Sequence, residues 1–96
     1  ESNINAFTEI VGYLLSNYFE KDVCNRILLL IGNLSSKVIA KDRERICTIL
    51  VEIFKKSSSD ENRRKCSVLI KDKGFSRKVR SLLDDNEMKQ YKAYLE

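Results

Sequence analysis

The residues best suited to chemistry in this sequence are cations gathered between residues 55 and 80. This segment carries ten Lys and Arg against three Asp and Glu, a net charge of +7, whereas residues 1–36 carry two basic and four acidic residues, a net charge of −2. Ammonium and guanidinium groups bind carboxylates and phosphates. We therefore predict a basic surface for an anionic partner. Its candidate contacts are Arg63, Arg64, Lys65, Arg77, Lys78 and Arg80.

Three interpretations of this basic segment are open. It can bind an acidic or phosphorylated protein segment, it can bind RNA or DNA, or it can be a solvated helix surface whose counter-charges lie elsewhere. Single-stranded nucleic acid is usually bound with the help of stacking aromatic side chains. Phe75 is the only aromatic residue between residues 55 and 80, and its place in the apolar pattern is typical of a core residue, while Tyr91 and Tyr94 lie beyond the segment. The sequence therefore favours a protein partner slightly over nucleic acid.

The sequence contains few of the residues and motifs that catalysis commonly uses. There is no histidine, no glycine-rich phosphate loop and no serine in a nucleophile elbow. The neighbouring carboxylates Asp84 and Asp85 occur where a helix is expected to begin, and capping is their ordinary role there. We therefore expect a protein that is not an enzyme and that needs no cofactor.

The cysteines indicate a reducing environment. Cys24, Cys47 and Cys66 are an odd number, widely spaced, and each lies within an apolar pattern. Such cysteines are typical of free buried thiols, and without histidine or a Cys-x-x-Cys pair they do not form a zinc site. No apolar run approaches the roughly 18 residues of a membrane-spanning helix. We therefore expect an intracellular protein, cytoplasmic or nuclear, with no metal and no membrane partner.

Composition and periodicity predict an all-α fold. The chain has no proline and only three glycines, and sheets need turns that lean on those residues. Apolar residues recur at steps of three and four through most of the sequence. We expect helices over residues 4–18, 21–34, 43–56, from the SSSDE link to 73, over 75–83 and after Asp84 or Asp85, with residues 38–42 a candidate for one further turn.

Several residues have the character of helix ends. Ser2 or Asn3 can cap the first helix, and Ser58 with Glu61 has the spacing of a capping box. Gly74 is suited to a left-handed helix stop. These positions divide the chain into helices joined by short polar links.

The run Ile27–Ile31 consists of five consecutive apolar residues. A short buried strand competes with a helix here, but the flanking residues continue at helical spacing, so a helix is favoured. A helix that is apolar nearly all round is expected to be covered on nearly all sides. We therefore predict that residues 21–34 are sandwiched between neighbouring helices, with Leu29 and Leu30 filling the flank opposite Leu28.

Three expected helices share one apolar pattern, at offsets of 39 and 29 residues. The matching sets are Phe7, Val11, Leu14 and Leu15, then Ile46, Leu50, Ile53 and Phe54, then Phe75, Val79, Leu82 and Leu83. Each is followed by a polar link, and the mean offset lies among the periods of helical repeats. Any two amphipathic helices can be aligned in this way, so the pattern alone does not settle a repeat.

The segment FTEIVGYLLSNYFEKDVCNRILLLIGNLSS resembles the second and third helices of an armadillo repeat. Leu14-Leu15 precede the polar turn and Asn33-Leu34-Ser35 end the long second helix, as in that family, and the segment around Gly74 and Leu82-Leu83 resembles the junction between repeats. HEAT-type hairpins fit nearly as well. The resemblance implies a right-handed stack of helical hairpins with about five to six helices.

The fold expected from this resemblance suggests a function class. We expect residues 1–96 to form a single α-helical domain that belongs to a longer protein, and to act as a non-catalytic scaffold or adaptor that binds an acidic or helical segment of another protein. The alternative is a basic helical module for RNA or DNA. The open ends of a short helical stack also predict self-association or flanking repeats.

Overall fold

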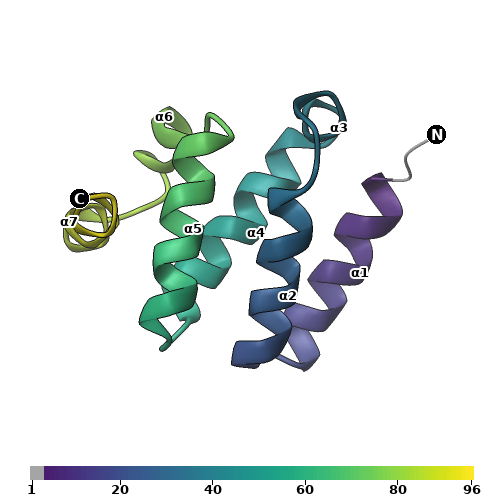
Figure 1. The fold of residues 1–96 in the computed structure, drawn as a ribbon, viewed down its shortest axis with the longest axis horizontal. Coiled ribbons are helices and arrows are strands. Elements are labelled where there is room, and N and C mark those ends of the chain that lie inside the picture. The colour runs from purple at the N-terminus through teal and green to yellow at the C-terminus, as the bar shows by residue number, and fades with distance from the viewer. Residues whose placement is uncertain (1–3) are drawn as a thin grey trace.

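The computed structural model describes residues 4–96, and within that range it is built of helices with no strand. Seven helices follow one another along the chain (Figure 1). They are α1 (Ile4–Asn17), α2 (Lys21–Gly32), α3 (Ser36–Ala40), α4 (Arg43–Lys56), α5 (Asp60–Asp72), α6 (Ser76–Val79) and α7 (Asp85–Tyr94). The predicted all-α class is confirmed, and the expected count of five to six helices is too low because the candidate turn near residues 38–42 is present as the short helix α3.

The helices begin and end close to the predicted positions because local signals determine those positions. Gly74 has φ +81°, the left-handed conformation that glycine adopts most readily after a helix. The side chain of Asp84 accepts a hydrogen bond from the backbone N–H of Glu87, whose carboxylate accepts one from the N–H of Asp84, so a capping box opens α7. At α5 the cap is Ser59 rather than the predicted Ser58. The predicted caps Ser2 and Asn3 lie outside the described residues.

The long helices form two antiparallel pairs, α1 with α2 and α4 with α5 (Figure 1). Helices α2 and α5 pack side by side and run in the same direction, and α1 packs against α4. The short helices α3 and α6 lie at one end of these pairs, and α7 crosses outside α5. Helix α4 is the most deeply buried, with seven of its fourteen residues in the core. They are Ile46, Cys47, Ile49, Leu50, Val51, Ile53 and Phe54.

The prediction that α2 is covered on nearly all sides is wrong. Leu28 is only 2% exposed, but Leu29 is 66% exposed and Leu30 is 52% exposed. The buried residues of α2 are Cys24, Ile27, Leu28 and Ile31, which form one stripe at helical spacing. Helix α2 is therefore an ordinary amphipathic helix with extra apolar residues on its solvent side, and α4 is the helix that is covered by its neighbours.

The predicted helix over residues 75–83 is mostly not a helix. Only Ser76–Val79 is helical, and the chain then turns before the cap at Asp84. Phe75, Val79 and Leu83 still reach the core, whereas Leu82 is 38% exposed. The apolar spacing here therefore serves a short helix with a turn instead of a long helix.

The three cysteines are free and buried, as predicted. Cys66 lies in the interface between α5 and its neighbours and is fully inaccessible to solvent. Burial, the largest cause, and the nearby Cys24 raise the pKa of the Cys66 thiol. Burial likewise raises the pKa of Cys24 and of Cys47. All three therefore stay protonated well above neutral pH in the folded chain.

The packing of α2 can be tested with two adjacent leucines. We expect Leu28→Ala to lower the free energy of unfolding by ~2–5 kcal/mol, because it leaves a cavity in the core. Leu29→Ala is the matched control, since the same atoms are removed from an exposed position, and it should change stability by less than about 0.5 kcal/mol. Urea unfolding followed by circular dichroism measures both. Equal losses for the two variants would contradict the burial described for α2.

The thiols give a second test of the core. Because their pKa values are higher in the folded than in the unfolded chain, we expect labelling of the native protein by a thiol reagent at about pH 8 to be slow and to depend on unfolding. The higher pKa values in the folded chain also predict how stability depends on pH. The contribution of the protonated thiols to stability is complete below about pH 8.5 and is lost as the pH rises above that value. Denatured chain is the labelling control. Rapid modification of Cys66 in the folded chain would contradict its burial.

Candidate functional site

The six candidate cations have different surroundings in the structure. Arg64 and Lys65 line a groove between α2 and α5, whereas Arg77 and Arg80 line a separate hollow beside α6. Arg63 and Lys78 are engaged in contacts between helices. The basic segment therefore divides into two exposed groups and two structural residues.

Arg63 is a structural residue that joins α5 to α7. Its guanidinium lies 5.0 Å from the ring centre of Phe54 and 5.6 Å from that of Tyr94, and it donates a hydrogen bond to the side chain of Gln90. Its Nε atom is buried without a hydrogen-bond partner. Arg63 is one of the predicted contact residues, and in the structure aromatic side chains from α4 and α7 lie around its guanidinium.

Tyr94 completes this contact between α5 and α7. Its hydroxyl donates a hydrogen bond of 2.8 Å to the carboxylate of Asp60, and its ring packs edge-on against Phe54. Burial, the largest cause, and the hydrogen bond to Asp60 raise the pKa of Tyr94. Tyr94 is therefore committed to holding α7 and is poorly placed to stack on a ligand.

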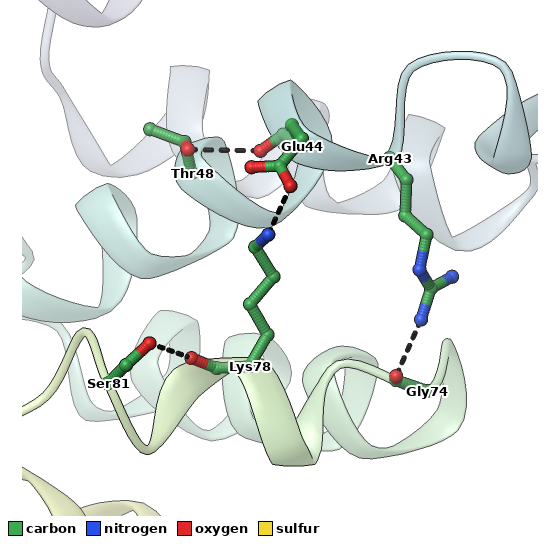
Figure 2. A network of polar contacts seen from close by, with 6 residues as sticks. All are labelled: Arg43, Glu44, Thr48, Gly74, Lys78 and Ser81. Atoms are coloured by element: carbon green, nitrogen blue, oxygen red, sulfur yellow. Dashed lines mark hydrogen bonds and ion pairs between the residues drawn. The ribbon is translucent and has the colours of Figure 1, made fainter.

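Lys78 is also held within the fold. It pairs with the carboxylate of Glu44 and links α6 to the first turn of α4 (Figure 2). Beside it, Arg43 donates a 2.6 Å hydrogen bond to the carbonyl of Gly74, which fixes the loop that leads into α6 (Figure 2). The guanidinium of Arg43 also lies 4.4 Å from the ring centre of Phe75. These contacts attach α6 to α4 and take Lys78 out of the set of free cations.

The groove between α2 and α5 has a volume of about 410 Å³. Its apolar lining comes from Leu28, Leu29, Gly32, Val68 and Leu69. Two of these residues, Leu29 and Val68, are 66% and 41% exposed, so this surface has apolar side chains in contact with water. A Cβ atom at Gly32 would lie 3.4 Å from a methyl group of Leu69, so the glycine lets the two helices approach closely at this end.

The polar lining of the groove is basic and neutral. It consists of Arg64 and Lys65 from α5 and of Asn25 and Asn33 from α2 and its C-terminal cap, and no acidic residue lines the groove. Lys65 donates a 2.5 Å hydrogen bond to Oδ1 of Asn25 and pairs with Glu61 at 3.2 Å. Arg64 lies 5.3 Å from the ring centre of Tyr94 and has no ion pair among the described residues. Of the two basic residues that line the groove, Arg64 is thus the one without an ion pair in the described part of the chain, and its guanidinium lies against Tyr94 of α7.

The second hollow is smaller and polar. Ser76, Arg77 and Arg80 line about 270 Å³ beside α6, and neither arginine has an ion pair within residues 4–96. The hydroxyl of Ser76 is 2.9 Å from that of Tyr91 and is therefore already bonded. This hollow has charge without an apolar surface, so it is less suited to hold a protein segment than the groove is.

Residues 4–96 contain no group of three or more acidic or cysteine side chains arranged to hold a metal ion. No described helix has the length and apolar character that crossing a membrane requires.

Comparison of the chain with protein-family models, with curated proteins and with solved structures finds no match. The residues of the groove must therefore be interpreted from their own chemistry. Leu29, Val68 and the two asparagines were not among the predicted site residues. The apolar pattern did not predict Leu29 and Val68 as site residues, because an apolar residue in an amphipathic helix is expected to face the core. The pattern also carried no signal for the asparagines.

The structural role of Arg63 can be separated from binding by comparing it with its neighbour. We expect Arg63→Ala to lower the free energy of unfolding by about 1–2 kcal/mol, because it removes the cation–aromatic contacts and the hydrogen bond that hold α7. Arg64→Ala, which removes an exposed guanidinium over one ring, should cost less than about 0.5 kcal/mol. Denaturant unfolding of both variants measures the difference. A larger loss for Arg64→Ala would contradict these roles.

Proposed function

We propose that this chain is a non-catalytic protein-interaction module that binds an acidic segment of another protein in the groove between α2 and α5. One observation carries the proposal: exposed apolar side chains and basic side chains line the same groove. Apolar side chains such as Leu29 gain free energy when a partner covers them. The adjacent Arg64 favours a partner that brings carboxylates.

The order of short and long helices along the chain supports the same class of function. The chain repeats an order of one short helix followed by two long ones in α3, α4 and α5, and α6 and α7 begin that order again. Armadillo-like and HEAT-like proteins use such helical stacks as binding scaffolds, which is the resemblance found in the sequence. We propose this architecture for the chain, with flanking repeats or self-association at its ends, and an intracellular setting in agreement with its free thiols.

Nucleic acid is the alternative partner, and the structure gives it less support. The aromatic residues near the basic segment are buried or already in contact with other side chains: Phe54, Phe75 and Tyr91 are in the core, and Tyr94 packs against Arg63 and Arg64. No aromatic residue lines the groove. A single strand would therefore be held there by phosphate contacts alone, and such contacts weaken steeply with salt.

The proposal predicts partner capture that depends on one face of α2. We expect proteins retained from a cell extract by the wild-type chain to be lost with Leu29→Glu and kept with Leu30→Glu. Leu30 is the matched control because it is similarly exposed but does not line the groove. A retained protein is then purified and titrated against the three chains. Equal loss with both variants, or with neither, would contradict binding in the groove.

A titration with labelled RNA and DNA separates the two partner classes. At about 150 mM salt, where exposed charges are screened beyond roughly 8 Å, we expect no binding of useful strength. If phosphates were the ligand, affinity for single strands would fall by roughly 0.7 log units per contact for each tenfold rise in salt. Micromolar binding that is lost on Arg77→Glu with Arg80→Glu would support the nucleic-acid alternative instead.

A further inference from the structure

We infer that the segment held in the groove between α2 and α5 is a short amphipathic helix with two neighbouring apolar anchors and with acidic residues on the flank that faces α5. This inference rests on the proposed function and specifies the conformation and charge pattern of the partner. It follows from the size of the groove, from the hydrogen-bonding groups in its lining and from the unequal distribution of its charges.

The size of the groove suits two or three apolar side chains. Its volume is about 410 Å³, and a cavity of about 150 Å³ is enough for a benzene-sized group. Along α2 it extends from Asn25 to Asn33, which is roughly 12 Å of helix at 1.5 Å per residue. In a partner helix, anchors separated by four residues are roughly 6 Å apart along the axis and project from the same face. Two successive anchors therefore fit within the length of the groove.

The hydrogen-bonding groups of the groove favour a helix over an extended segment. An extended segment brings backbone N–H and C=O groups that need partners when they are covered. The groove is walled by two helices, and it has no strand edge to pair with. Arg64 and Lys65 can only donate hydrogen bonds, and Oδ1 of Asn25 already accepts one from Lys65. Few acceptors are left for the N–H groups of an extended chain, whereas a helix satisfies its backbone internally.

The charges of the groove determine where the acidic residues of the partner lie. Both cations come from α5, while the polar side chains that α2 and its cap contribute are the uncharged Asn25 and Asn33. The hydrogen bond between Lys65 and Asn25 places Lys65 at the Asn25 end of the groove, away from the close approach of Gly32 and Leu69, and Arg64 precedes Lys65 on α5. The partner therefore needs carboxylates on one flank and near one end, and no charge where it faces α2.

Two peptide libraries displayed on phage test this inference with the whole chain as the target. The first is a helical framework held by a side-chain staple, with its surface positions varied among apolar, acidic, basic and neutral residues. The second library has the same length and the same varied positions. It differs in carrying a proline in its centre, so that its peptides cannot form a continuous helix. Both are selected on the wild-type chain and depleted on the Leu29→Glu chain, and selected peptides are titrated against wild type, Leu29→Glu, Leu30→Glu and Arg64→Glu.

We expect enrichment from the helical library of peptides with two apolar residues four positions apart and acidic residues on one flank. Their affinity should fall at least tenfold with Leu29→Glu and at least threefold with Arg64→Glu, and should change less than twofold with Leu30→Glu. Circular dichroism of each variant checks that the fold is intact. Enrichment from the proline library alone would overturn the helical conformation but leave the proposed function standing. Enrichment of helices without an acidic flank would overturn the charge pattern, and enrichment from neither library would overturn both proposals.

Discussion

The structure depends on the burial of α4. Half of its residues are in the core, and it packs against α1, α2, α3, α5 and α6. Helix α4 fills the space between the other helices. Helices α2 and α5 therefore each need to bury only the residues that face α4 or that face each other. Their outer faces are left to solvent, and where these faces meet, they form the groove. The groove is thus a consequence of how the core is filled.

The same burial explains how the outer elements are attached. Phe54, near the end of α4, is fully buried and supplies the ring against which Tyr91, Tyr94 and Arg63 pack. Glu44, in the first turn of α4, holds Lys78 of α6 (Figure 2). One end of α4 therefore fixes α7 and the other end fixes α6. Two of the six candidate cations, Arg63 and Lys78, are used in these attachments.

Local structure could be predicted from the sequence, whereas the identity of the exposed faces could not. The limits of α4, the stop at Gly74 and the cap at Asp84, which was one of two candidates with Asp85, follow from spacing and from the chemistry of single residues, and they agree with the structure. In Ile27–Ile31 every direction around the helix is apolar, so the pattern cannot show that Leu29 and Leu30 are the two left uncovered. Likewise, Arg63, Arg64 and Lys65 are consecutive and point in three directions, and only the positions of Phe54 and Tyr94 decide that Arg63 turns inward.

The composition of the groove also limits which partners it can hold. Covering Leu29 and Val68 favours association with any apolar surface, including the groove of a second copy. Such a pairing would bring Arg64 and Lys65 of both copies into a contact to which the groove contributes no acidic residue. Removing these charges from water without partners costs free energy, and like charges in the same contact repel. An acidic helix avoids both costs and gains the same apolar contact. In the proposed complex, the cations would contribute to specificity both by attracting carboxylates and by making apolar partners without acidic residues unfavourable, and specific interfaces commonly use both effects.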